Sequence, residues 1–230
     1  MLQYELRRTK RKTIGIKIEL DGAVIVTAPS RFSEKEIKRI VKEKEGWIKK
    51  RQEDIKRASE ELAGDMAFLK DKLLYLGQPY FVDVVLEPEF YKTTAGLYGE
   101  KIYIMAQAFD EMEMRDVLEQ WYRSEAKRII ADRIALYQPE IGVKVNSFRI
   151  KDQKTRWGSA SSKGNLNFNW RLVMAPVEVI DYVVIHELCH LREMNHSKQF
   201  WSLVEQYDKE YKKHREWLKK KGRLLERRIR

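Results

Sequence analysis

The chain has a single cysteine, Cys189, which excludes an intramolecular disulfide and favours a reducing compartment. No apolar run reaches the roughly 18 residues that a membrane helix needs, and no apolar signal core lies near Met1. A glycine-rich loop of the kind that cradles phosphates is also lacking, which argues weakly against nucleotide chemistry. We therefore expect a cytoplasmic protein without a membrane partner, and the sequence makes no prediction of its oligomeric state.

Positive charge is in excess, and it is unevenly distributed. The formal net charge is +11, and the segment 212–230 alone has ten Lys or Arg residues against two Glu. Such a segment is most often a solvated helix end, with nucleic acid or another polyanion as its alternative partner. Between residues 176 and 200, four acidic residues oppose two basic ones. We therefore expect the chemistry to lie apart from the basic surface.

The N-terminal region is expected to be rich in strands. Apolar residues alternate from Ile14 to Leu20, and a second extended segment, 24–28, follows a turn at Asp21-Gly22. This pattern predicts a hairpin. Ser33 and Glu36 have the spacing of a capping box, so a helix is expected from Ser33 to about residue 60.

Further strands and a long helix are expected in the middle of the chain. Extended segments are predicted over 73–86 and 101–105, where glycine and proline punctuate apolar runs. An amphipathic pattern predicts a helix over 110–137 that ends before Pro139. We place a domain boundary near the start of this helix, which gives an N-terminal region 1–108 and a C-terminal domain 109–230.

Two strands are expected after this helix, over 145–150 and 165–173, on either side of a polar turn over 151–164. In the second strand one face is apolar and the other carries asparagines at 165, 167 and 169. The asparagine face is either simply solvated or belongs to an edge strand onto which an extended peptide could be added.

The candidate site lies in the following segment. The whole chain has only four histidines, and three of them fall between positions 186 and 196. His186, Glu187 and His190 form an H-E-x-x-H pattern within the apolar segment 177–189, which predicts a buried helix. Residues four apart lie within about 40° on one helical face, so both imidazoles can bind one ion beside Glu187. Cys189 is expected to be a small buried residue and not a nucleophile.

His196 completes a set of three ligands only if the chain turns. On a continuous helix it would lie on the opposite side from His190, so the helix must end between Arg192 and Asn195. Asn195 is the expected left-handed terminator, and Ser197 is the expected N-cap of the next helix.

Three histidine ligands predict catalytic zinc chemistry. They leave a fourth tetrahedral position for water, whose pKa zinc brings to about 7. Glu187 is expected to act as general base, and a peptide or protein is the expected substrate. The negative oxygen of the intermediate needs one more donor, for which Arg156, Arg171 and Tyr207 are candidates.

Several short, separated sequence motifs resemble those of a known family. They are His186 to His190, Asn195-His196-Ser197, Phe200-Trp201, Thr155-Arg156-Trp157-Gly158-Ser159, Gly164-Asn165-Leu166-Asn167, Trp170-Arg171-Leu172 and Ile180-Asp181-Tyr182-Val183. The chain resembles the YgjP-like metal-dependent hydrolases, which are related to the SprT-like and WLM metallopeptidases. This resemblance runs over about residues 150–218 and implies that His186, His190 and His196 bind the metal and that Glu187 is catalytic.

The chain departs from the family pattern at two places. Ala160 stands where the family commonly has cysteine, so no role of that cysteine can be carried over. Lys209 stands near the position where the last helix commonly has proline. Neither change removes a predicted ligand.

Together these expectations define an α+β protein. A β-rich N-terminal region with a long helix would recognise substrate or shield the site. It would precede a zincin-like helical metal-binding domain with a small antiparallel sheet.

Other zinc sites were weighed against this one. The spacing also fits the metzincin pattern, but Glu193 occupies its glycine position and no methionine follows Met194. A gluzincin with a distant glutamate ligand is disfavoured because only four glutamates remain after Met194. A closed structural site with His214 or Cys189 as fourth ligand stays open.

Two other functions remain alternatives to a peptidase. One is zinc-dependent hydrolysis of a nucleotide phosphoanhydride, in which arginines would hold the phosphates. The other is a nucleic-acid-associated binding module that keeps zinc for stability.

Overall fold

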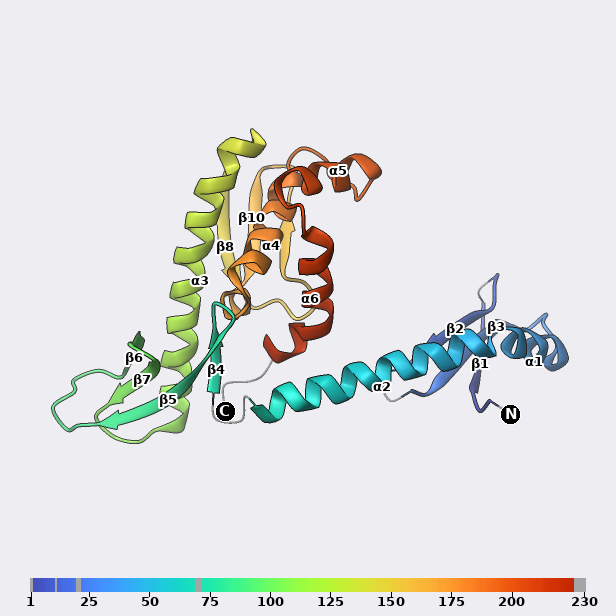
Figure 1. Cartoon of the computed structure of the whole chain (residues 1–230), viewed down its shortest axis with the longest axis horizontal. Coiled ribbons are helices and arrows are strands. Elements are labelled where there is room, and N and C mark those ends of the chain that lie inside the picture. The colour runs from blue at the N-terminus through green and yellow to red at the C-terminus, as the bar shows by residue number, and fades with distance from the viewer. Residues whose placement is uncertain (1, 11, 20–21, 69–71, 226–230) are drawn as a thin grey trace. The chain divides into compact units, whose positions relative to one another are not determined.

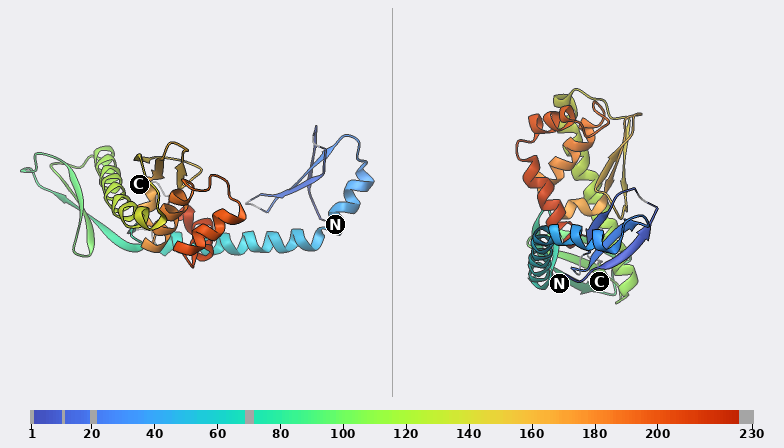
Figure 2. Two further views of the ribbon diagram at one scale, coloured as in Figure 1. Left: turned by 90° about the horizontal axis from the view of Figure 1, so that it is seen from above. Right: turned by 90° about the vertical axis from the view of Figure 1, so that its right-hand side faces the viewer.

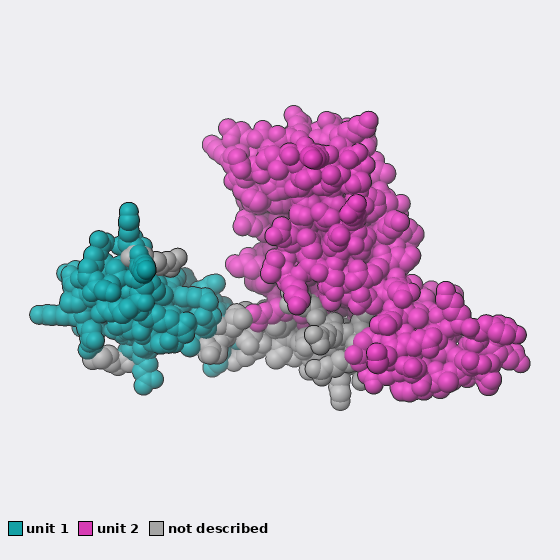
Figure 3. All heavy atoms as spheres, turned by 180° about the vertical axis from the view of Figure 1, so that it is seen from behind, with its two compact units in different colours: residues 1–65 teal, residues 66–230 magenta. Residues whose placement is uncertain are grey.

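The computed structural model describes residues 2–10, 12–19, 22–68 and 72–225, and over 58–68 it describes the helical backbone only. The chain forms two compact units, Met1–Asp65 and Met66–Arg230 (Figure 3). The candidate site lies wholly in the second unit.

The first unit contains a three-stranded sheet in the order β1-β3-β2. β1 (Glu5–Thr9) pairs in parallel with β3 (Val24–Pro29), and β2 (Gly15–Ile18) pairs with β3 in antiparallel register. The pairing of β2 with β3 is the predicted hairpin. Gly22, with a φ of 85°, provides the left-handed conformation in its turn. Asp21 lies outside the described residues.

The helix predicted from Ser33 to about residue 60 is in fact two helices, α1 (Glu34–Glu43) and α2 (Glu45–Phe68). The capping box is confirmed, because the Ser33 side chain accepts from the Glu36 amide and the Glu36 side chain accepts from the Ser33 amide. Lys44 interrupts the helices with φ −94° and ψ 3°. These angles lie in the bridge region, which does not require glycine, so the residue at position 44 does not by itself predict the break.

The second unit begins with a four-stranded sheet in the order β4-β5-β7-β6. Its strands are β4 (Lys72–Tyr75), β5 (Gln78–Leu86), β6 (Thr94–Tyr98) and β7 (Lys101–Ala106). The expected strand 73–86 is divided by a turn at Leu76-Gly77. The amides of these two residues donate to Val173 (2.8 Å) and Met174 (3.1 Å), next to the candidate site helix. This sheet therefore belongs to the same compact unit as the site, and the boundary expected near residue 108 falls inside that unit.

The long helix is α3 (Glu111–Ile141), and it starts at the predicted place. The Asp110 side chain accepts from the amides of Met112 and Glu113 as N-cap. The expected end before Pro139 is wrong, because the helix continues through Pro139 to a left-handed Gly142 at φ 72°. The Gly142 amide bonds both Gln138 and Pro139 carbonyls, so a terminal turn forms beyond the proline.

A small sheet of three strands follows α3, in the order β8-β10-β9. The strands are β8 (Ser147–Lys151), β9 (Gly158–Ala160) and β10 (Asn165–Asn169). β10 is parallel to β8 and antiparallel to β9, so the sheet is mixed and not purely antiparallel as expected. β10 is the central strand, which rules out the alternative that its asparagine face belongs to an edge strand.

The strand expected over 165–173 ends early. A 3-10 helix, η1 (Trp170–Met174), follows β10 and begins where the Asn169 side chain accepts from the Arg171 amide. Trp170, Leu172 and Val173 remain buried, although they no longer alternate along a strand. The apolar pattern thus predicted the burial of Trp170 and Leu172 correctly, but it predicted the strand correctly only as far as Asn169.

Three helices complete the unit: α4 (Val177–Cys189), α5 (Lys198–Tyr207) and α6 (Tyr211–Leu225). α4 packs against β9, α3, α5 and α6, and it lies between the small sheet and α6 (Figures 1 and 2). This central place explains why its sequence is apolar on nearly all sides. In the described parts of the chain, no helix is both long and apolar enough to cross a bilayer.

A charged contact joins α3 to α4. Arg133 binds the Asp181 carboxylate with two nitrogens, and the Tyr137 hydroxyl donates to the same carboxylate at 3.0 Å. Only 15% of the Asp181 side chain is exposed. Such a contact orients α4, because bidentate pairing fixes direction as well as distance.

We predict that Asp181→Ala lowers the free energy of unfolding by about 2–4 kcal/mol, since Arg133 would be left without its carboxylate. Asp132→Ala is the matched control, because Asp132 pairs with Arg128 at 3.7 Å and its side chain is 64% exposed. Its effect should stay within about 0.5 kcal/mol. Urea denaturation measures the free energy of unfolding of both variants. Equal losses would contradict a stabilising role of the contact between Arg133 and Asp181.

Candidate metal centre

The structure brings the three predicted ligands together. His186 and His190 lie on one face at the end of α4, and His196 lies just before α5. Their ligand atoms are all within 4.8 Å of one another, and Nε2 of His186 is 3.2 Å from Nε2 of His196. Two nitrogens that bind one zinc ion tetrahedrally at 2.0–2.1 Å are roughly 3.4 Å apart. The spacing of these two atoms therefore fits zinc.

The turn that delivers His196 differs in detail from the expected one. α4 ends at Cys189 with His190 as its C-cap, earlier than the predicted 192–195. Asn195 is not left-handed, since Leu76 is the one non-glycine residue with a positive φ among the described residues. Ser197 is the predicted N-cap, and its hydroxyl accepts from the Phe200 amide at 3.2 Å. The earlier end of α4 gives the chain more residues in which to reverse.

Aromatic packing holds the imidazole rings. His190 stacks on Phe200 with centroids 4.4 Å apart, and His196 stacks on Trp201 with centroids 5.5 Å apart. Both aromatic residues belong to the first turn of α5. The same helix that follows His196 therefore also orients His190.

Hydrogen bonding and burial prepare the rings to bind a metal. Nδ1 of His190 is 3.1 Å from the Glu193 carbonyl oxygen, a contact that leaves Nε2 free. Burial lowers the pKa of His186 to about 3, with smaller contributions from His190, His196 and Arg215. Burial likewise lowers the pKa of His190. A neutral imidazole has a free lone pair, so these two residues fit the chemistry of a zinc ligand.

Glu187 is buried beside the ligands, with 5% of its surface exposed. Burial raises its pKa to about 8, and the nearby charge of Arg156 acts in the opposite direction. A dication next to this carboxylate would lower its pKa again, which would leave it able to accept a proton near neutral pH.

Gly158 in β9 makes room for Glu187. A Cβ atom at residue 158 would lie 2.6 Å from Oε1 of Glu187 and 2.7 Å from its Cγ. Real Cβ atoms do not approach so closely, so any larger residue would displace the carboxylate. The sequence analysis predicted neither β9 nor this contact. The one available signal was that Gly158 belongs to a sequence motif shared with the family.

Two residues considered as a fourth ligand lie outside the cluster. Cys189 is fully buried, and burial raises the pKa of its thiol to about 12, as expected for an unreactive cysteine. Nδ1 of His214 is 2.9 Å from the Asp208 carboxylate. In the described part of the chain, the three histidines form the one group of three or more His, Cys, Asp or Glu side chains that could hold a metal ion.

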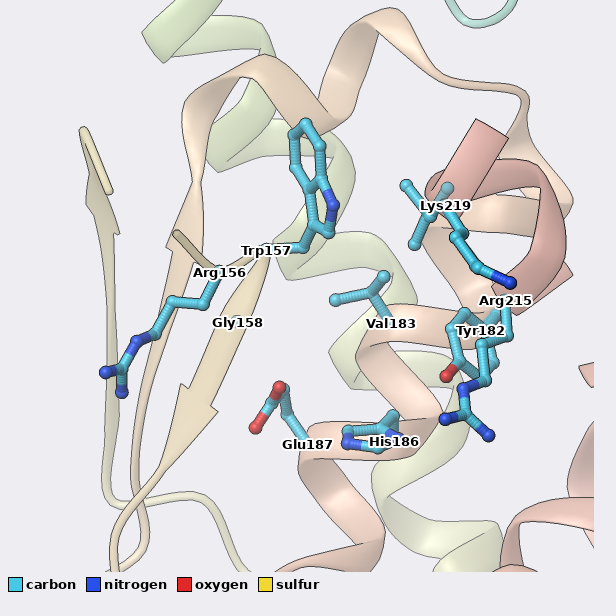
Figure 4. A pocket seen from close by; sticks show the side chains of 10 residues that line it. Arg156, Trp157, Gly158, Tyr182, Val183, His186, Glu187, Arg215 and Lys219 are labelled. Carbon is cyan, nitrogen blue, oxygen red and sulfur yellow. The ribbon is translucent and has the colours of Figure 1, made fainter. Parts of the chain in front are cut away.

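A cleft of about 340 Å³ opens next to His186 and Glu187. β9 and the preceding loop form one wall, α4 forms the floor, and α6 forms the other wall with Arg215, Leu218 and Lys219 (Figure 4). The expected separation of chemistry from the basic surface is therefore wrong. Charges counted along residues 176–200 did not include those that α6 brings to the same place.

The three candidates for an additional donor have different positions. The Tyr207 hydroxyl donates to the Glu140 carbonyl, and Arg171 pairs with Asp152, so neither lines the cleft. Arg156 lines it, but its guanidinium points away from Glu187 in Figure 4. Tyr182 was missed: it lies one helical turn before His186, and its hydroxyl is directed toward His186 (Figure 4). Its spacing of four from His186 was the signal that could have identified it.

A helix with two histidines and a glutamate, close to a third histidine and next to a cleft that His186 and Glu187 line, is typical of a metallopeptidase-type domain. A family model described as "YgjP-like, metallopeptidase domain" matches residues 12–221. The chain belongs to this family, and the match includes residues 12–65 of the first unit as well as the site. Membership supports a metal-dependent hydrolase.

Comparison with individual proteins adds little to this assignment. No curated protein sequence matches the chain. Among solved structures, the chain is similar to the metallopeptidase zymogen abylysin of Pyrococcus abyssi, with 26% identity over 39% of this chain and 93% of that chain. The TM-score of 0.34 is too low to imply a common arrangement of the two whole structures.

We predict one zinc ion per purified chain, lost in His190→Ala because two imidazoles bind zinc far more weakly than three. His214→Ala is the control, since His214 lies outside the cluster, and it should retain the ion. Elemental analysis by mass spectrometry measures both. Zinc retained in His190→Ala, or lost equally in both variants, would contradict the assignment of ligands.

We also predict that Gly158→Ala lowers the free energy of unfolding by about 1–3 kcal/mol through overpacking against Glu187. Zinc content should be unchanged, since no ligand is touched. Gly46→Ala is the control because a Cβ there meets no atom within 4 Å. It should be neutral or slightly stabilising in the same denaturation assay. A neutral Gly158→Ala would show that Glu187 is not confined as described.

Proposed function

We propose that the protein is a zinc-dependent peptidase in which His186, His190 and His196 hold the ion and Glu187 is the general base. The observation that supports this most directly is the convergence of three imidazoles at the edge of an open cleft, with a buried carboxylate beside them. When bound, zinc would supply an activated water and polarise the substrate carbonyl.

The protein's own residues have separate tasks in this reaction. Glu187 accepts the proton of the attacking water and then donates it to the leaving amine, which requires a carboxylate whose pKa lies near the working pH. Burial raises the pKa of Glu187 toward that range, and the close approach of Gly158 confines the carboxylate to one position. Tyr182 is the proposed donor to the oxygen on which negative charge develops.

The small sheet offers a place for an extended peptide. β9 is an outer strand in the order β8-β10-β9, and its Gly158 faces Glu187. A peptide that pairs with the free edge of β9 would run past Glu187 and the histidines. The proposed substrate strand thus lies along β9, and not along β10, which was one of two alternatives from the sequence.

We predict that Glu187→Gln retains zinc and the fold but lowers the rate of peptide hydrolysis by at least about 10²-fold, because the amide cannot accept the proton. Glu193→Gln is the matched control, since the Glu193 side chain is exposed and only its carbonyl contacts His190. It should keep its activity. A screen of fluorogenic peptides measures the rates, and full activity in Glu187→Gln would exclude this mechanism.

A further inference from the structure

The wall of the cleft formed by α6 is positively charged. Arg215 and Lys219 are four residues apart on α6 and therefore share a face of the helix, and both line the cleft beside His186. Glu187 is the one acidic residue in the lining, against the three basic residues Arg156, Arg215 and Lys219. A bound metal ion would add further positive charge. The cleft as a whole therefore attracts anions.

Arg215 has a fixed place next to the metal ligands. Its guanidinium lies over the Trp201 ring, 4.8 Å from the centroid, and the Trp201 ring stacks on His196. Arg215, His186 and Tyr182 line the same cleft. A stacked guanidinium is orientated in advance, and its remaining N–H groups are suited to a planar anion.

Arg215 is not used for stabilising the fold through an ion pair. The other basic residues of α6 whose ion pairs are seen contact Glu205, Glu210 or Glu216. Among the described residues, Arg215 has no carboxylate partner. Lys219 shares Glu216 with Lys220 at 3.4 and 3.9 Å, and all three side chains are about half exposed or more. Lys219 can therefore turn from its exposed ion pair toward a ligand at little cost, and within the described parts of the chain Arg215 has no ion pair to break.

The position of this wall is set by packing and not by a loose tail. A Cβ at Gly222 of α6 would lie 3.0 Å from the Trp157 ring, so α6 closely approaches the loop before β9. Leu218 and Leu225 are buried, and α6 packs on α4. The charged face of α6 is thereby held opposite Gly158 and Glu187 across the cleft (Figure 4).

We propose that Arg215, assisted by Lys219, forms an anion subsite that selects substrates with a carboxylate or phosphate next to the bond that is cleaved. For the proposed peptidase this means a peptide with an acidic side chain or a terminal carboxylate at that position. This inference rests on the proposed metal site. It assigns part of the basic C-terminal segment to substrate selection.

Binding of small hydroxamates tests the subsite without requiring turnover. Succinic monohydroxamate and its monoamide both chelate zinc, and they differ only in a carboxylate against a carboxamide. Calorimetry with the zinc-loaded full chain should show the carboxylate ligand to bind at least about tenfold more tightly, as expected for a charge-assisted contact. Phosphonoacetohydroxamate is the third probe, and its rank against the carboxylate ligand identifies which anion the subsite prefers.

Variants of α6 localise the effect. Arg215→Gln should reduce the ratio between the first two ligands to about two or less, Lys219→Gln should reduce it partly, and Arg215→Lys should restore part of it. Lys220→Gln is the matched control, because Lys220 neighbours Lys219 but does not line the cleft, and it should leave the ratio unchanged. Zinc content must stay at the wild-type level in each variant, which separates loss of the subsite from loss of the metal.

If the wild-type protein binds the charged and neutral ligands equally, the proposed anion subsite is wrong, whichever peptides the protein cleaves. An unchanged ratio in Arg215→Gln would overturn the role of this residue. If the preference is present but no peptide is cleaved, the subsite stands and the peptidase proposal fails. If neither hydroxamate binds in a zinc-dependent way, both proposals fail.

Discussion

The convergence of three imidazoles, from the end of α4 and from the turn before α5, is the constraint on which the rest of the site depends. A single helix can align His186 with His190, but only a reversal of the chain brings His196 to them. That reversal is fixed by local contacts: the Glu193 carbonyl meets His190, Ser197 caps α5, and Phe200 and Trp201 pack on the rings of His190 and His196. The second helix thus acts as a support for ligands on both sides of the turn.

Burial of the site helix has two chemical consequences. It lowers the pKa of His186 and His190, which favours imidazoles with a free lone pair, and it raises the pKa of Glu187. A buried carboxylate must also fit its surroundings, and the absence of a side chain at Gly158 provides the space. Arg133 of α3 pairs with Asp181 of the site helix α4. The Leu76-Gly77 turn donates two hydrogen bonds to η1, which directly precedes this helix.

Local features of this protein could be predicted from the sequence. The Ser33 and Ser197 caps, the start of α3 at Asp110 and the common face of His186 and His190 depend on residues within one turn of each other. The α+β class was also correct.

Features that depend on tertiary contacts could not be predicted in this way. β9 is three residues long in a polar segment, and it forms a strand only because β10 lies beside it. β10 ends at Asn169, whose side chain caps η1 and also donates to the carbonyl of Gln153, 16 residues earlier. The charge of the cleft was misjudged because Arg215 is distant from His186 in sequence and becomes its neighbour only when α6 packs on α4.

Zinc-edge anomalous diffraction from crystals of the zinc-loaded chain tests the central claim most directly. The account predicts one ion about 2.0–2.1 Å from a ring nitrogen of each of His186, His190 and His196, with a solvent molecule as the remaining ligand. An ion without His196, or one whose fourth ligand is a protein side chain, would contradict it.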